Sequence, residues 1–324
     1  MNSSIVFGTD GWHGILGEDC TDENILRIAN AFALYLQENF THPQTIAIGF
    51  DGRKDSHHFA KIFSDVLSSY SYTVLLSNKL IPTPILSFAV KHYGCAAGIM
   101  ITAGYNPGQF NGVKFKTKDG KPFLSEETKK IEQFLAKPKM LLHQTKGTIT
   151  ETDFLPPYLM HLESIVDFPA LRLFAQKPGS NACVIIDSMG GAGQMILEEI
   201  LVGLEWRAQT IFGAPEPTFY DRLPKAIEKN MEPLIFNVSV TDALLGIATD
   251  GDAEHFSITF EDGKCMSAKE IEMAMNFKIQ KGFLRGYLLQ YDGLLAGLLF
   301  AEMIAMTEKS LREIVEKVTV GFVQ

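Results

Sequence analysis

Residues 97–115 of the chain read AGIMITAGYNPGQFNGVKF. Gly98 to Thr102 is a short apolar run with strand character, and the loop after it is rich in glycine and proline. Glycine and proline at such a position end the strand and force a turn, so the strand delivers this loop at its end. The stretch predicts a strand-to-loop unit of a layered α/β domain.

Strand and helix patterns alternate on the N-terminal side of this stretch. The segment 21–40 has Thr21 as its expected N-cap, and its apolar residues recur at helical spacing. These apolar positions are Ile25, Ile28, Ala29, Phe32 and Leu36. A strand over 45–50, a helix over 57–68 and a strand over 73–76 are expected to follow.

A second α/β unit is expected after a linker that runs from about Lys137 to Pro156 and Pro157, because paired prolines discourage a continuous helix. Its expected elements are strands over 182–187, 246–249 and 256–260, a helix over 195–204, and a mainly helical segment from Ser267 onward. A Gly-Gly-Ala-Gly loop at 190–193 could cradle a phosphate through its backbone amides. It lacks a Walker lysine and the full dinucleotide fingerprint, so we favour a structural role for it.

Composition excludes several classes of protein. The 324 residues are 46% hydrophobic and 21% charged, which indicates a folded soluble protein and not a disordered one. A net charge of −9 disfavours nucleic acid or an anionic membrane as partner. No signal peptide is expected at the N-terminus, and Leu294–Ile304 is too short to span a bilayer and is expected to be a buried helix. The four cysteines have no zinc or disulfide spacing, which favours a reducing cytoplasm.

A second polar loop, residues 249–255, reads TDGDAEH. Asp250, Asp252 and Glu254 offer carboxylate oxygens at alternate positions, and such oxygens are the ligands that Mg²⁺ prefers. Taken alone, an Asp-Gly-Asp segment is more often a solvated turn. Weak binding of Mg²⁺ is therefore an expectation that depends on the surroundings of the loop.

Several further motifs occur in a fixed order. They are FGTDGWHG at 7–14, FDGR at 50–53, TAGYNP at 102–107, NGVK at 111–114, FYDRLP at 219–224, TDGDAEH at 249–255 and YDGLLA at 291–296. In this order they resemble the α-D-phosphohexomutases, the phosphoglucomutase and phosphomannomutase family. His13 stands where that family has an arginine, and Glu254 stands where it has an aspartate.

The resemblance implies an α/β fold with a particular domain organisation. Residues 1–137 match domain I, residues 138–260 match domain II with its acidic metal loop, and residues 261–324 match an abbreviated, mainly helical domain III. The family's sugar-selecting Gly-Glu-Glu-Ser-Gly loop is missing between 263 and 291, and a fourth domain is expected to be absent. Two complete α/β domains and a helical remnant are thus expected.

The resemblance also assigns roles to single residues. Gly104 occupies the position of the family's phosphoserine, and Tyr105 the position of the histidine beside it. Glycine has no oxygen that could carry a phosphoryl group, so the nucleophile is lost. Lys114 matches the general acid/base lysine, and the substrate-binding candidates are Arg53, Tyr105 and Asn106, although an arginine after a strand more often braces a loop through carbonyl groups.

Three functions stay open at this point. The first is a degenerate family member, a pseudoenzyme without mutase activity that binds a hexose phosphate or has a regulatory or scaffolding role. The second is an active phosphohexomutase, an intramolecular phosphotransferase of altered mechanism or one completed by a partner chain. The third is a decaying gene product.

Self-association, or a protein partner, is a further expectation. The shortened third domain leaves apolar helix faces without their usual cover, and a bare apolar patch usually marks an interface. The alternative is that these helices fold back on the second domain. The residues concerned are Ile271, Met275, Leu294, Leu295, Leu298, Leu299, Met303 and Ile304.

Overall fold

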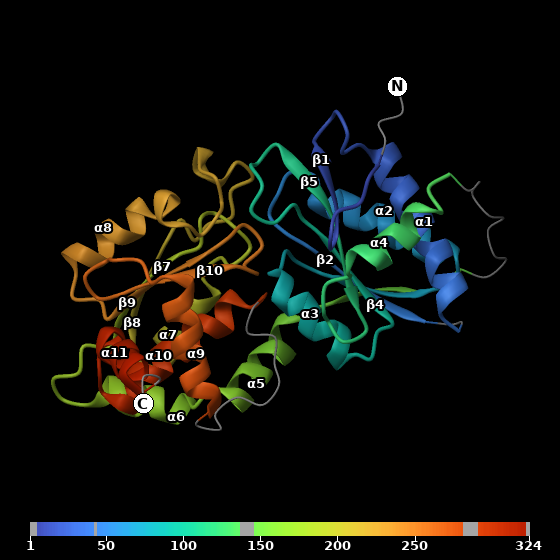
Figure 1. The fold of residues 1–324 in the computed structure, drawn as a ribbon. Helices are drawn as coiled ribbons and strands as arrows, with labels where there is room; N and C mark the ends of the chain where they lie inside the picture. The colour runs from blue at the N-terminus through green and yellow to red at the C-terminus, as the bar shows by residue number, and fades with distance from the viewer. Residues whose placement is uncertain (1–4, 42–43, 137–145, 281–290, 322–324) are drawn as a thin grey trace. The chain divides into compact units, whose positions relative to one another are not determined.

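The computed structural model describes residues 5–41, 44–136, 146–280 and 291–321 (Figure 1). The chain divides into two compact units, each with its own sheet. The first unit contains residues 1–158 and takes in residues 216–221 from later in the chain. The second contains residues 159–215 and 222–324. The expected linker around Lys137 lies outside the described residues.

A six-stranded sheet forms the centre of the first unit, in the order β1-β5-β4-β2-β3-β6. Its strands are β1 Gly11–Ile15, β2 Thr45–Phe50, β3 Thr73–Ser77, β4 Ala97–Ile101, β5 Phe110–Thr117 and β6 Ile149–Thr152. Strand β5 runs antiparallel to both β1 and β4, whereas β2, β3, β4 and β6 pair in parallel. The helices of this unit are α1 Asp22–Asn39, α2 Ser56–Ser69, α3 Thr83–His92 and α4 Ser125–Glu132.

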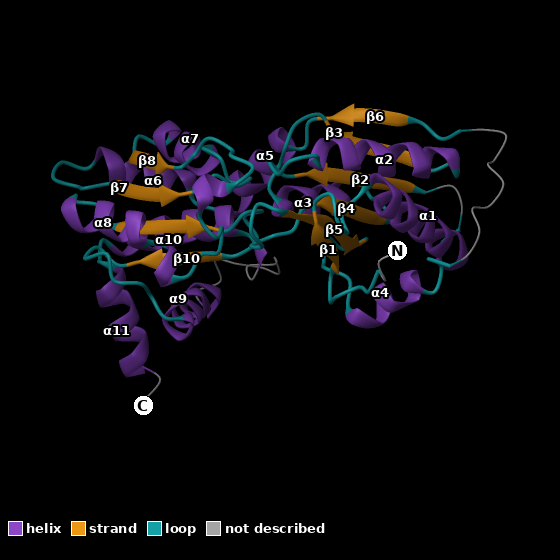
Figure 2. Ribbon diagram, turned by 90° about the horizontal axis from the view of Figure 1, so that it is seen from above, coloured by secondary structure: helices purple, strands orange, loops and turns teal. Residues whose placement is uncertain are grey.

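Helix α1 confirms the sequence prediction in detail. The Thr21 hydroxyl caps it by accepting a hydrogen bond from the Asn24 amide at 3.3 Å. The five apolar residues predicted for its inner face are all fully buried. Helices α1 and α2 pack against each other, and α2 also contacts β2, β3 and β4 (Figure 2). Helix α3 contacts β2, β4 and β5, so both α2 and α3 fix the strands whose ends carry the polar loops.

A four-stranded sheet forms the centre of the second unit, in the order β10-β9-β7-β8. Its strands are β7 Cys183–Asp187, β8 Arg207–Ile211, β9 Leu245–Thr249 and β10 Phe256–Thr259. Only β10 among them is antiparallel to its neighbour. The helices are α6 Phe168–Gln176, α7 Ile196–Gly203, α8 Glu232–Val240, α9 Ala268–Gln280, α10 Gly293–Thr307 and α11 Leu311–Gly321. Helix α5 Leu155–Ile165 contains the boundary between the units.

Helix α10 is buried on nearly every side, as predicted for the apolar run at 294–304. It contacts α6, α7 and β9, and its leucines are at most 1% exposed. Met275 and Met303 are buried as well. Ile304 is buried too, whereas Ile271 is only half-buried. Most of these apolar residues are therefore covered inside the second unit, as in the fold-back alternative. Exposed apolar helix faces therefore no longer support a protein partner, and a partner stays a proposal.

The structure corrects the linker that was expected between about 137 and 157. Residues 149–152 form β6, which pairs with β3 in the first sheet. Pro156 and Pro157 lie in the first turn of α5. Proline is tolerated there because the first amides of a helix have no partner within the helix. Among the described residues, no helix combines the length and the apolar character needed to cross a membrane.

Candidate functional site

The loop after β4 places Gly104 in a left-handed backbone conformation, with φ of +57°. Only glycine adopts this conformation without steric cost, because a Cβ would crowd the backbone. The Gly104 amide donates to the Thr102 hydroxyl at 2.9 Å. The residue that the resemblance places at the nucleophile position thus has a backbone that suits glycine.

The Arg53 side chain stabilises this loop through hydrogen bonds to its carbonyl oxygens. Its Nη2 donates to the carbonyl oxygens of Gly104 at 2.6 Å and Asn106 at 2.7 Å, and its Nη1 donates to those of Pro107 and Phe110, each at 2.9 Å. Its Nε donates to Asp51 at 3.1 Å. A guanidinium has five N–H donors, and these bonds account for all of them. The geometry therefore gives Arg53 a loop-bracing role, and ligand binding by this residue remains a sequence-based expectation.

Asp51 is the buried anion that pairs with Arg53, and both side chains are inaccessible to solvent. Burial raises the pKa of Asp51, while Arg53 and hydrogen bonds from Thr102 and Ser56 oppose that rise. Ser56 in turn accepts from the Asn111 side-chain amide at 2.9 Å. This network ties the ends of β2, β4 and β5 together beneath the Gly104 loop.

Tyr105 and Asn106 form the outer part of the same loop. The Tyr105 side chain is exposed, as a ligand-contacting group would need to be. The Asn106 side-chain amide donates to the Ala103 carbonyl at 2.8 Å and so stabilises the turn. The side chain of Asn106 therefore shapes the loop that presents Tyr105.

Lys114 lies on β5 opposite β1. The strand register pairs Gly11 with Lys114 and His13 with Gly112. A Cβ on Gly11 would lie 1.8 Å from the Val113 carbonyl oxygen, so glycine is required for this close strand contact. The Lys114 ammonium lies 3.7 Å from the Asp10 carboxylate, and its side chain is 13% exposed. Lys114 is thus a partly desolvated amine, as its predicted acid/base role requires.

Residues 216–221 form a strained turn on the first unit. Phe219, Tyr220 and Asp221 all have positive φ, which is unusual for three consecutive non-glycine residues. The Glu216 carboxylate accepts hydrogen bonds from the amides of Thr218 and Tyr220, each at 2.9 Å. The turn packs against Arg53, the residue that stabilises the Gly104 loop: the centre of the Phe219 ring lies 4.6 Å from the guanidinium carbon of Arg53.

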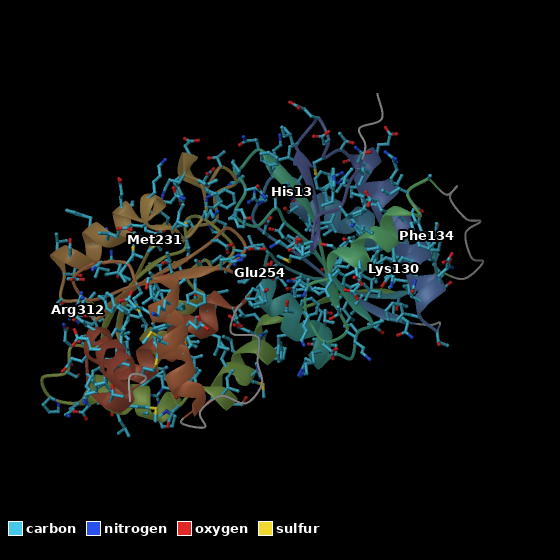
Figure 3. The ribbon with its side chains drawn as sticks, in the orientation of Figure 1. His13, Lys130, Phe134, Met231, Glu254 and Arg312 are labelled. Carbon is cyan, nitrogen blue, oxygen red and sulfur yellow. The ribbon has the colours of Figure 1, made fainter. Side chains whose placement is uncertain are left out.

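In the second unit, the acidic loop follows β9. Asp250, Asp252 and Glu254 are all buried there, and Figure 3 labels Glu254. The Asp250 carboxylate accepts from the His255 amide at 3.1 Å and pairs with the His255 ring nitrogen Nδ1 at 2.9 Å. The Gly251 amide donates to the Pro224 carbonyl at 3.1 Å, which joins the loop to the FYDRLP motif.

The fit of a metal ion to this loop is incomplete. Three carboxylates have the right donor chemistry for Mg²⁺. Within the described ranges, however, no three His, Cys, Asp or Glu side chains are placed so that they could hold an ion together. Both oxygens of Asp250 also engage His255. As it stands, the loop does not present a coordination site, so we derive no chemical step through a metal.

The Gly190–Gly193 loop uses its amides internally. The amides of Gly190, Gly191 and Ala192 donate to the carbonyls of Phe212, Ser188 and Gly251, respectively. Their distances are 2.8, 2.7 and 3.0 Å. This pattern agrees with a structural role for the loop, because amides that already donate to carbonyl oxygens are not available to bind a phosphate.

Some residues of the candidate site were missed by sequence reasoning. His255 was not predicted to be the partner of Asp250, and Asp10 was not singled out beside Lys114. His13 was noted only as a replacement, yet the strand register places it on the Lys114 face of the sheet. The FGTDGWHG motif contained the signal, since the spacing of Asp10 and His13 is fixed there.

Comparison with known proteins agrees with the motifs. Residues 4–141 match the phosphoglucomutase/phosphomannomutase α/β/α domain I, and residues 156–263 match domain II of the same family. A phosphoglucomutase/phosphomannomutase of Thermococcus kodakarensis is 27% identical, over 80% of this chain and 56% of that protein. A phosphoglucosamine mutase of Sulfurovum sp. is 28% identical, over 90% of this chain and 63% of that protein.

A solved structure from Thermus thermophilus, described provisionally as a phosphomannomutase, is also similar. It is 27% identical and has a TM-score of 0.87, over 99% of this chain and 84% of that one. An N-acetylphosphoglucosamine mutase of Aspergillus fumigatus was solved with magnesium, but its TM-score of 0.45 supports no argument about this chain. The chain spans a little over half the length of its first curated relatives. Two matched domains in family order are decisive, and the chain belongs to the phosphoglucomutase/phosphomannomutase family.

Proposed function

We propose that this protein is a catalytically degenerate phosphohexomutase that binds a hexose phosphate without forming a phosphoserine. The observation that carries the proposal is Gly104, which lacks an oxygen and has φ of +57°. A phosphohexomutase passes its phosphoryl group through a covalent enzyme intermediate, and other groups do not restore what the loss of a nucleophile removes. Such a pseudoenzyme is suited to a regulatory or scaffolding role.

Retention of the surrounding loop supports ligand binding. The Arg53 hydrogen bonds and the buried network around Asp51 stabilise the loop in one conformation. Lys114 supplies a cation on the neighbouring strand, and Tyr105 is an exposed residue that has a hydroxyl group. A phosphate ester is the class of ligand that a lysine and a hydroxyl donor would recognise.

The test is to incubate the protein with a glucose bisphosphate and to measure its intact mass. The expected result is no covalent adduct, together with saturable binding of glucose 1-phosphate by calorimetry. A stable phosphoenzyme would refute the proposal. It would favour an active enzyme of altered mechanism, for which the partly buried Lys114 is the supporting observation.

Three further features belong to the proposal. All four cysteines are free, which supports a reducing cytoplasm. Mg²⁺ is proposed to bind weakly, since Asp250, Asp252 and Glu254 would have to rearrange to share an ion. Homo-oligomerisation, or completion by a partner chain, stays a proposal that comes from the sequence alone.

A further inference from the structure

The pairing of β1 with β5 brings two basic side chains to one face of the sheet. His13 lies directly opposite Gly112, and Lys114 is two residues further along β5. Side chains two residues apart on a strand point to the same face, so His13 and Lys114 are diagonal neighbours. Diagonal neighbours have their Cα atoms about 7–8 Å apart, a span that one tetrahedral oxyanion can bridge between long side chains. Gly112 contributes no side chain between them.

More positive than negative side chains lie near the His13 ring. Lys114 and Arg53 are cations near the ring, and Asp10 is the anion near it. Lys114 meets Asp10 at 3.7 Å, a distance too long for a strong hydrogen bond. Arg53 is already committed to Asp51 and the loop carbonyls. The Phe110 ring packs edge-on against the His13 ring, with 6.0 Å between the ring centres, and is an apolar neighbour of the imidazole.

His13 is exposed on β1, where Figure 3 labels it, and is accessible to a ligand. We propose that His13 and Lys114 together bind the oxyanion of a sugar ester, and that the proton on His13 sets the affinity. This inference rests on the proposed function and deepens it, because it names the group that tunes binding.

The sign of the pH dependence follows from the surroundings of His13. Although the residue is exposed as a whole, partial desolvation of its ring lowers the pKa of His13; the charges of Lys114 and Arg53 act in the same direction, whereas Asp10 opposes them. The imidazole is therefore neutral at neutral pH and gains its charge only below its ordinary pKa of about 6.5. A bound anion favours the imidazolium, so affinity rises as the pH falls through that range. An arginine at this position would show no such dependence.

The experiment uses glucose 6-sulfate as probe. A phosphate monoester changes its own charge near pH 6, with a second pKa of about 6, whereas a sulfate ester keeps one charge throughout. Calorimetric titrations from about pH 5.5 to pH 8, the range in which histidine titrates, compare the parent with His13→Gln and His13→Arg. His58→Gln is the matched control, because His58 is an exposed imidazole on α2 that pairs with Asp22.

We expect the parent and His58→Gln to bind roughly two- to fivefold more tightly at the acidic end, as for an exposed ion pair. His13→Gln should lose this gain, and His13→Arg should bind with equal affinity across the range. By linkage, saturating glucose 6-sulfate should raise the His13 pKa measured by NMR in the parent.

The same pH dependence in the parent and in His13→Gln, or a His13 pKa that the probe leaves unchanged, would overturn the inference and leave the proposed function standing. Absence of binding by the parent and by His13→Arg, for glucose 6-sulfate and glucose 1-phosphate alike, would overturn the proposed function and the inference with it.

Discussion

The guanidinium of Arg53 donates a hydrogen bond of 2.6 Å to the carbonyl oxygen of Gly104, the residue that the sequence resemblance places at the position of the family's phosphoserine. Arg53 makes four such bonds to loop carbonyls and one to buried Asp51. The loop shape therefore depends on a side chain from the end of β2. The stability of the loop can be measured separately from any catalytic activity.

Arg53→Ala should be strongly destabilising. It leaves the Asp51 carboxylate buried without its cation and removes the donors for four carbonyls. Breaking a buried pair in this way costs about 3–5 kcal/mol. Urea unfolding of the first unit would measure the loss. Arg172→Ala is the control: Arg172 forms an exposed pair, so its change should be within about 0.5 kcal/mol, and an equal effect of both changes would contradict the bracing role.

Gly104→Ser should reduce stability without restoring activity. A side chain in the left-handed region costs about 1–2 kcal/mol. Gly104→Ala separates the backbone cost from any effect of the hydroxyl. Gly94→Ala gives the cost of the same backbone region in open space, because Gly94 has φ of +64° and no atom within 4 Å of an added Cβ. A melting temperature of Gly104→Ser equal to or higher than that of the parent would show that the loop readily accommodates a serine.

Cys20 and Cys95 should resist alkylation in the folded protein. Burial raises the pKa of each thiol to about 12, and nearby aspartates add to the effect at Cys20. Because only the thiolate reacts, about one thiol in ten thousand is reactive at pH 8. Mass spectrometry after iodoacetamide treatment should find both unmodified, with modification appearing on unfolding. Rapid labelling of either cysteine in the native state would contradict the packing around α1 and β4.

Magnesium titrations should show weak binding, with a dissociation constant of about 1 mM or higher, since Mg²⁺ demands strict octahedral geometry and the three carboxylates must move to provide it. Asp252→Ala should abolish the signal, because it removes one buried carboxylate from the acidic loop. Lys79→Ala, which alters an exposed pair in the first unit, is the control. Identical titrations of the parent and Asp252→Ala would remove the acidic loop from consideration as a metal site.

Much of the fold could be predicted from the sequence because local patterns dictate it. The apolar spacing in 21–40 gave α1 with its Thr21 cap, and the apolar runs at 45–50 and 182–187 gave β2 and β7. Strands β1 and β5 were missed because their glycines weaken any alternation. Their pairing is a long-range contact that no local pattern reports.

The site was predicted unevenly for a related reason. Motif order identified the residues, but their partners come from distant parts of the chain. Phe219 meets Arg53 across more than 160 positions, and sequence spacing contains no signal for that contact. Likewise, only the structure shows that the carboxylate of Asp250 engages His255.

The most direct test of the central claim is a coupled assay for conversion of glucose 1-phosphate and mannose 1-phosphate, with a glucose bisphosphate as activator. The parent and Gly104→Ser should both give no turnover above background, because the first lacks a nucleophile and the second holds its hydroxyl on a strained backbone. Turnover by the parent at the rate of an intact mutase, abolished by a chelator, would contradict the account.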